Sequence, residues 1–268
     1  MKLNAFPSAV VRAILMVGLL ASSAGCVTTT NSPFAKDADQ QKAEESYVRL
    51  GLAYIGQGHY DRARDRLQRA LDIDSDSPGA LAGMGLVYQS EGEPELAEKA
   101  FRRALSSDSS YTRGRIFYGA FLYNQGRYEE AEEQFQRASQ DVEYTERASI
   151  FYNLGRAQEQ QQDYPAAAKS YKRAVNLSRG KPDYLLALSS LLLKADDYNQ
   201  ASIYYRQLTT VMDRNPNLQH SPESLLTGLR LAHYFGDSHR EASLALLLRN
   251  QYPESEQLKQ YRALISND

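Results

Sequence analysis

The sequence has 268 residues, a formal net charge of −2 and a hydrophobic content of 42%, with one cysteine, Cys26, and no tryptophan. A chain of this size can form one large domain or two small ones, and its lack of a basic excess argues against a nucleic-acid partner. A single cysteine cannot form an internal disulfide bond, which excludes a disulfide-stabilised fold.

Residues 1–25 have the composition of a secretory signal peptide. Lys2 and Arg12 supply positive charge, residues 13–21 form an apolar run, and small residues follow at positions 22–25. The apolar run is about half of the roughly 20 residues that a membrane-spanning helix needs. We therefore expect a cleaved signal rather than a lasting transmembrane helix.

The stretch Ser-Ala-Gly-Cys at residues 23–26 resembles the lipobox of bacterial lipoproteins, although leucine is more usual in the place of the serine. In that motif the cysteine thiol is lipidated and becomes the new N-terminus, so Cys26 is the predicted lipidation site. Two or more acyl chains anchor a protein stably to a membrane. Val27 replaces the aspartate that favours inner-membrane retention, and resemblance to that sorting rule implies the outer membrane, facing the periplasm. The alternative is an ordinary secretory signal with an incidental cysteine.

Residues 26–42 lead from the lipidated cysteine to the folded part. They are mostly polar, include Pro33 and show no apolar periodicity. We expect a flexible tether that lets the folded part move about 20–25 Å from the membrane surface.

The remaining sequence carries an internal repeat. Glycines recur at intervals of 34, 34 and 36 residues, at Gly51, Gly85, Gly119 and Gly155. Alanines recur at the same intervals, at Ala63, Ala97, Ala131 and Ala167. Glycine within a helix costs about 1 kcal/mol relative to alanine, so glycines in phase need a reason. We expect each glycine to let two helices pack closely, with an aromatic side chain filling the space between neighbouring helix pairs.

This pattern resembles the tetratricopeptide repeat, whose 34 residues form two antiparallel helices. In the second copy, Gly85 is followed by Ala97 and Phe101 at the spacing of that motif. The resemblance implies an all-α solenoid, a right-handed superhelix of about six helix pairs with a C-terminal capping helix. We place five repeats in residues 43–211, and a divergent sixth pair with the capping helix in residues 212–268. All belong to one domain, because a single repeat cannot bury its own apolar face.

In such a solenoid the first helix of each pair lines the concave face. Positions one and four residues after the repeat glycine, and three before it, point into the resulting groove. These positions are mainly apolar in the first three pairs, which predicts a protein-binding groove formed by Val48, Leu52, Ile55, Leu86, Ile116, Ala120 and Tyr123. In the fourth pair they include Tyr152, Arg156 and Glu159. An accessible apolar surface favours binding of an apolar or β-strand-like segment of a partner; alternatively, loops or the N-terminal segment cover it.

The sequence shows no pattern typical of a catalytic or metal site. The four histidines, His59, His220, His233 and His239, lack metal-ligand spacing, and there is no nucleophile elbow or glycine-rich phosphate loop. Acylation of Cys26 leaves no thiol nucleophile. We therefore expect a non-enzymatic protein without cofactor, metal or small-molecule substrate.

The arrangement of these features resembles the type IV pilus biogenesis and stability proteins of the PilW/PilF family. The features are the lipobox, the tandem repeats, the insertion before the fourth repeat, and a short sixth pair followed by Tyr-Pro-Glu-Ser at residues 252–255. The resemblance implies a pilotin, an outer-membrane lipoprotein that binds the pilus secretin subunit and promotes localisation and multimerisation of the secretin pore. The alternative is a general periplasmic adaptor that scaffolds peptidoglycan enzymes or outer-membrane assembly machinery.

Overall fold

The computed structural model describes residues 33–266, with side chains from Asp37 onward. The signal peptide, Cys26 and the first part of the predicted tether lie outside the described residues. The chain divides into two units, residues 1–43 and residues 44–268. The helix contacts discussed below belong to the second unit.

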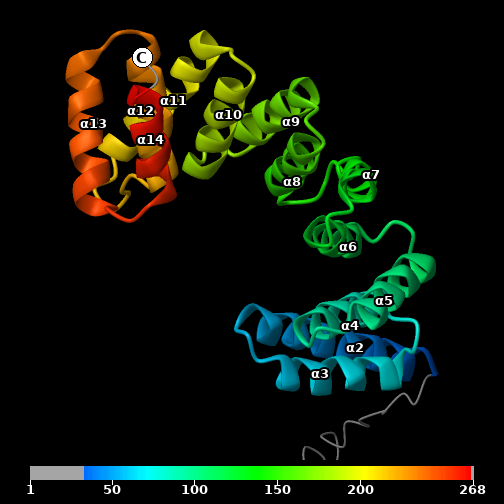
Figure 1. Ribbon diagram of the computed structural model, residues 1–268. Coiled ribbons are helices and arrows are strands. Elements are labelled where there is room, and N and C mark those ends of the chain that lie inside the picture. Colours follow the sequence, from blue (N-terminus) through cyan, green and yellow to red (C-terminus); the bar gives the residue numbers. More distant parts are fainter. Residues whose placement is uncertain (1–32, 267–268) are drawn as a thin grey trace, which may run out of the picture. The chain divides into compact units, whose positions relative to one another are not determined.

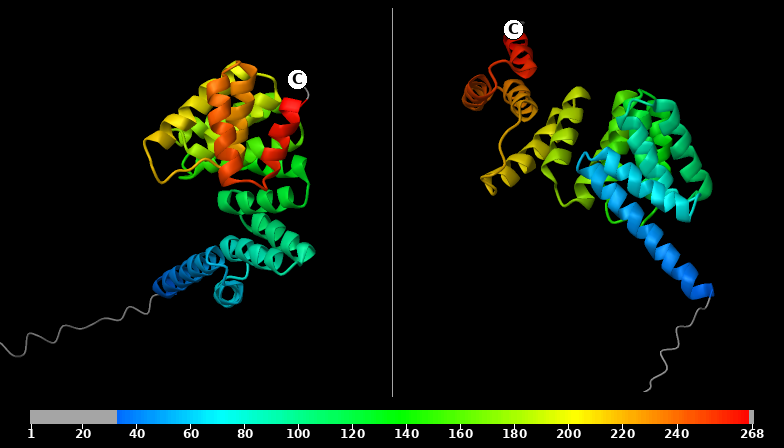
Figure 2. Two further views of the ribbon diagram at one scale, coloured as in Figure 1. Left: turned by 60° about the vertical axis from the view of Figure 1, so that its left-hand side comes forward. Right: turned by 90° about the horizontal axis from the view of Figure 1, so that it is seen from below.

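The described residues form thirteen helices and no strand (Figure 1). The helices are α2 (Pro33–Gly56), α3 (Tyr60–Ile73), α4 (Pro78–Ser90), α5 (Pro94–Ser107), α6 (Thr112–Asn124), α7 (Tyr128–Ala138), α8 (Arg147–Gln160), α9 (Tyr164–Leu177), α10 (Pro182–Lys194), α11 (Tyr198–Asp213), α12 (Pro222–Tyr234), α13 (Ser238–Gln251) and α14 (Glu256–Ser266). They follow one another as six hairpin pairs, α2–α3 to α12–α13, and Figure 2 shows them from two further directions. This architecture confirms the predicted all-α solenoid. None of these helices is both long and apolar enough to cross a bilayer.

Helix α2 begins at Pro33, so residues 33–42, which the sequence assigned to the flexible tether, are helical. Alanine, lysine and glutamine, which are strong helix formers, make up more than half of the segment, and proline is well suited to a first helical position. The tether was predicted because this segment lacks apolar periodicity. That absence indicates that no face of the segment is buried, but it does not prevent the segment from forming a helix. The prediction therefore differs from the structure over these residues.

Several helices begin at a capping side chain. Asp163, Asp197 and Asp237 precede α9, α11 and α13, and each accepts a hydrogen bond of 3.1 Å from the backbone N–H three residues later. Ser77 and Ser221 do the same before α4 and α12, where a proline follows. Such caps satisfy backbone donors that the helix itself leaves unpaired.

Each repeat glycine lies against a large side chain of the second helix in its own pair. A Cβ atom at Gly85 would lie 2.6 Å from the ring of Phe101, and one at Gly155 would lie 2.6 Å from the ring of Tyr171. The equivalent distances are 2.8 Å for Gly119 and Phe135, and 2.7 Å for Gly51 and Leu67. Side chains in native cores do not approach this closely, so glycine is required for the contact.

The repeat alanines complete this packing. Ala63, Ala97, Ala131 and Ala167 are all 0% exposed. The sequence placed the aromatic side chain between neighbouring pairs, whereas the structure also places it directly over the glycine of the same pair.

Two later pairs use variants of the same contact. In the fifth pair Ser189 replaces glycine, and its hydroxyl donates a hydrogen bond of 2.9 Å to the carbonyl oxygen of Ala201. In the sixth pair a Cβ at Gly228 would lie 2.9 Å from Leu244 and 2.7 Å from the ring carbon Cζ of Tyr205. Gly228 is therefore the repeat glycine of the sixth pair, which the sequence analysis did not identify.

Helix α14 packs beside α12 (Figures 1 and 2). Leu258 and Tyr261 of α14 join a buried cluster with Leu225 and Leu229 of α12 and Leu248 of α13. The helix thus covers apolar side chains of the last pair, which is the role of a cap in a solenoid.

Glu98 of α5 links the second pair to the third. Its carboxylate accepts hydrogen bonds from Arg127 at 2.7 Å, from Arg102 at 2.7 Å and from the hydroxyl of Tyr118 at 2.9 Å. The hydrogen bonds from Arg127 are the main reason that the pKa of Glu98 falls from its ordinary 4.5 to about 2, while partial burial acts in the opposite direction.

We expect Glu98→Gln to make folding stability less sensitive to acid between about pH 5 and pH 2. Because the folded-state pKa is depressed, the stabilisation by the ionised carboxylate is present above the unfolded-state pKa and is lost as the pH falls toward 2. Urea unfolding at several pH values should show a steeper acid loss in the wild type than in this variant. Glu95→Gln, which changes an exposed carboxylate on the same helix, is the control. Equal acid sensitivity in all three proteins would contradict the assignment.

Candidate protein-interaction surface

The seven predicted groove residues lie on the first helices of the first three pairs. Val48, Leu52 and Ile55 belong to α2, Leu86 to α4, and Ile116, Ala120 and Tyr123 to α6. All seven are half-buried, so part of each side chain remains accessible. The surface therefore offers apolar area for contact, but every residue in it also packs against the protein.

The structure brings these residues together in two groups. Leu86, Ile116, Ala120 and Tyr123 pack against the buried cluster of the second and third pairs. Val48 and Ile55 pack against the buried cluster that contains Leu67 and Met84. Leu52 packs against neither cluster and is the groove residue that depends least on the core.

Val48 has a packing role that the repeat spacing did not indicate. A Cβ atom at Gly79, near the start of α4, would lie 2.8 Å from Cγ1 of Val48. Val48 therefore forms part of the contact between the first and second pairs, and its remaining surface borders the predicted groove.

Tyr123 marks a change from apolar to polar side chains. Its ring lies 5.2 Å from the ring of Tyr128, and the guanidinium of Arg156 lies 4.3 Å from its centroid. Farther along, Glu159 accepts hydrogen bonds from Lys194 at 2.5 Å and from the hydroxyl of Tyr171 at 2.8 Å. The apolar and polar parts thus meet at a cation–π contact between the third and fourth pairs.

A second exposed apolar group lies in the last pairs and was missed in the sequence. The rings of Tyr198 and Tyr234 stack with centroids 3.7 Å apart and an interplanar angle of 4°, and Phe235 lies edge-on to Tyr234 at 5.0 Å. Tyr234 and Phe235 are 56% and 50% exposed. The sequence did contain a sign of this exposed group. Two aromatic residues, Tyr234 and Phe235, precede the turn glycine of the sixth helix pair, at positions where the third helix pair has the polar residues Asn124 and Gln125.

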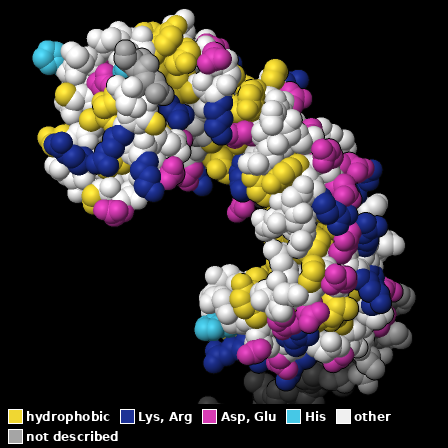
Figure 3. Space-filling view, in the orientation of Figure 1, with side chains coloured by type: hydrophobic (Ala, Val, Ile, Leu, Met, Phe, Trp, Pro, Cys, Tyr) yellow, Lys and Arg dark blue, Asp and Glu magenta, His cyan; other side chains and the backbone are white. Residues whose placement is uncertain are grey.

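On the face shown in Figure 3, apolar side chains form separate patches among charged ones rather than one continuous band. This distribution fits an interaction surface that combines apolar contacts with charged surroundings.

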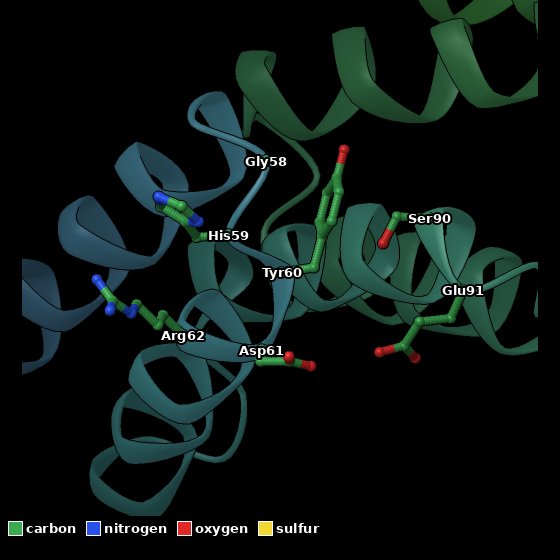
Figure 4. A pocket seen from close by; sticks show the side chains of 7 residues that line it. All are labelled: Gly58, His59, Tyr60, Asp61, Arg62, Ser90 and Glu91. Carbon is green, nitrogen blue, oxygen red and sulfur yellow. The ribbon is translucent and has the colours of Figure 1, made fainter.

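A cavity of about 410 Å³ lies at the turn between α2 and α3. Figure 4 shows His59 and Arg62 on one side of it and Ser90 and Glu91 on the other. Glu91 forms an ion pair with Arg64, so its carboxylate is already engaged. Throughout the described part of the chain, no group of three His, Cys, Asp or Glu side chains is arranged to hold a metal ion.

Comparison with protein families identifies the repeats directly. Two tetratricopeptide-repeat models match the chain, one at residues 48–112 and the other at residues 112–180. The matched regions cover the first four helix pairs, except for the beginning of α2.

Comparison with individual proteins covers nearly the whole sequence. The chain is 38% identical over 255 residues to the type IV pilus assembly protein PilF of Pseudomonas aeruginosa, covering 94% of this chain and 98% of that protein. A solved structure of Pseudomonas aeruginosa PilF superimposes with a TM-score of 0.75 at 36% identity, covering 84% of this chain and 99% of the other. PilW, described as a widely conserved type IV pilus biogenesis factor, shares the fold at 23% identity with a TM-score of 0.68, covering 81% of this chain and 97% of the other.

Proposed function

The chain belongs to the family of the type IV pilus assembly protein PilF, and from this premise we propose that it is the pilotin of a type IV pilus secretin. In this role it binds the secretin subunit, directs the subunit to the outer membrane and promotes its multimerisation. It acts as a scaffold, without catalysis or cofactor. The observation that carries the proposal is the relationship to PilF over almost the full chain, and the tetratricopeptide repeats supply a fold suited to protein–protein contact.

The binding groove of this proposal is formed by the half-buried apolar residues of α2, α4 and α6. A segment of the secretin subunit would cover the accessible parts of Leu52, Ile55 and Leu86. Complete burial of an exposed leucine contributes about 1.5–3 kcal/mol, and a half-buried one contributes part of that amount. Several such side chains together can hold an apolar or β-strand-like segment.

The lipid anchor gives this groove its effect in the cell. A groove tethered through Cys26 is confined to a thin layer beside the membrane, so captured secretin subunits reach a higher local concentration there. This is the advantage of a linked binding site, and it favours multimerisation at the right membrane.

Affinity capture with the anchored protein tests the partner assignment. The protein should retain secretin subunits from an envelope extract in preference to peptidoglycan enzymes or outer-membrane assembly factors. Predominant recovery of those enzymes or factors would instead favour the general adaptor, the alternative suggested by the repeats alone.

We expect Cys26→Ala to release the protein from the outer membrane and to reduce or misplace secretin multimers. The substitution removes the only thiol that could carry acyl chains while leaving the repeats unchanged. Membrane fractionation and mass spectrometry of the mature N-terminus measure the two parts of this prediction. Normal outer-membrane fractionation of the variant would refute the anchor, whereas secretin binding by the released protein should persist.

A further inference from the structure

A cavity of about 590 Å³ lies along α8 and α9, and none of its lining residues belongs to the proposed secretin groove. Its apolar lining includes Phe151 and Leu154 of α8. Three cationic side chains of α9, Lys169, Lys172 and Arg173, line it as well. We call Phe151 and Leu154 the apolar floor of the cavity, and the three cations its basic wall.

The three cations occupy one side of α9, because residues three and four positions apart are neighbours on a helix surface. Among the described residues none of the three forms an ion pair, whereas Arg102 pairs with Glu98 and Arg137 with Glu133 one helical turn away. Lys169 and Arg173 are exposed, and Lys172 is half-buried. Their charges are thus available to a partner.

Two guanidinium groups lie within 6 Å of the ring centroid of Phe151. Arg173 is 5.7 Å from the centroid of its ring, and Arg147 is 5.8 Å from it. The Nε atom of Arg147 is buried and has no hydrogen-bond partner in the part of the chain that the structure describes. Arg147, which contacts the ring of Phe151, thus adds a fourth positive charge to the neighbourhood of the cavity.

Glu132 of α7 bonds a residue that lines the cavity and is engaged by three side-chain amides. Glu132 accepts hydrogen bonds from the side-chain amides of Gln158 at 2.9 Å, Gln161 at 2.7 Å and Gln136 at 2.8 Å. Gln158, which lines the cavity, also accepts a hydrogen bond of 2.7 Å from the hydroxyl of Ser170. These bonds engage Gln158 and Ser170 of the cavity lining, and the three cations remain as its charged groups.

We propose that this cavity binds an acidic peptide segment of a partner protein, at a second site separate from the secretin groove. Carboxylates of the segment pair with Lys169, Lys172 and Arg173, and an apolar or aromatic side chain of the segment covers Phe151 and Leu154. A carboxylate fits the planar fork of an arginine, and each contact with a charged group outweighs a neutral hydrogen bond.

The dimensions favour a peptide over a membrane lipid. The apolar floor extends over about one helical turn, from Phe151 to Leu154, which suits one or two side chains. The long acyl chains of a phospholipid would need a continuous apolar channel, and the other lining residues of this cavity are mainly polar or charged.

Fluorescence anisotropy with a labelled peptide of alternating glutamate and phenylalanine residues tests this site on the purified full chain in detergent. Lys172→Glu with Arg173→Glu should weaken binding about tenfold or more, and Lys169→Glu alone should weaken it about threefold. Added salt should weaken the wild-type interaction. Circular dichroism checks that the variants remain helical.

The matched control is Lys99→Glu with Arg249→Glu, which makes the same change in net charge at two exposed residues of other second helices. It should leave peptide affinity unchanged, as should Leu52→Glu in the secretin groove. Equal weakening by the control, or unchanged affinity in the α9 variants, would overturn the proposal. If the α9 variants lost binding to phosphatidylglycerol vesicles but kept their affinity for the peptide, the proposal would also be overturned, and the cations would be assigned to binding an anionic lipid.

Discussion

Replacing Leu52 and Leu86 with glutamate should abolish secretin multimers while leaving the helical content of the protein unchanged. Each substitution removes accessible apolar area from the proposed groove and places a charge where the partner would exclude water. A combined loss of about 4 kcal/mol in binding energy weakens the complex about a thousandfold. Gel electrophoresis of secretin multimers and circular dichroism of the purified variant measure the two outcomes.

Leu96→Glu is the matched control for this experiment. Leu96 is also a leucine, but it is 45% exposed on α5, the second helix of its pair, and is not a predicted groove residue. Its substitution should leave multimers at the wild-type level. Leu52→Glu alone is the cleaner single variant, because Leu86 also packs against the core of the second and third pairs. Persistence of multimers in a folded Leu52 and Leu86 double variant would show that the groove is wrongly assigned.

Gly85→Ala should lower the free energy of unfolding by about 1–2 kcal/mol, even though alanine is the better helix former. Its Cβ would lie 2.6 Å from the ring of Phe101, which is 0% exposed and belongs to the buried core of the second and third pairs. Overpacking of this kind outweighs the gain of about 1 kcal/mol in helix propensity. Urea unfolding of the wild type and the variant measures the difference.

Two further variants separate the steric effect from helix propensity. Gly56→Ala, in α2, introduces a Cβ with no neighbouring atom within 4 Å and should stabilise the protein by up to about 1 kcal/mol. Phe101→Leu should reduce the cost of Gly85→Ala, giving a favourable coupling energy of about 1 kcal/mol in a double-mutant cycle. A Gly85→Ala protein as stable as the wild type would contradict the ring-on-glycine contact.

The sequence was sufficient to predict the helix pairs, because the 34-residue spacing reflects a contact within each pair. The offset from Gly85 to Phe101 recurs from Gly119 to Phe135 and in the other early pairs. Gly228 makes the same contact with Leu244, but the connection at residues 214–221 shifts it out of phase, so the period could not reveal it. The start of α2 was missed for another reason. Its residues favour a helix through their intrinsic propensity, and they show no apolar periodicity from which the helix could be predicted.

The candidate surfaces were less predictable, because they depend on contacts between pairs. Spacing from the repeat glycine assigned Leu52 and Val48 to the first helix of their pair, but only the structure shows Val48 against Gly79. The stack of Tyr198 on Tyr234 joins two different pairs, and its geometry depends on how those pairs pack. The basic cavity likewise has lining residues from both α8 and α9. How these two helices are rotated against each other cannot be predicted from the sequence of either helix alone.

Site-specific photo-crosslinking from position 52 tests the central claim most directly. A photoreactive residue in place of Leu52, in the membrane-anchored protein, should form a cross-link to the secretin subunit, and the same residue in place of Leu96 should not. Cross-links to the secretin from position 96 but not from position 52, or capture of peptidoglycan enzymes alone from position 52, would contradict the proposed groove and its partner.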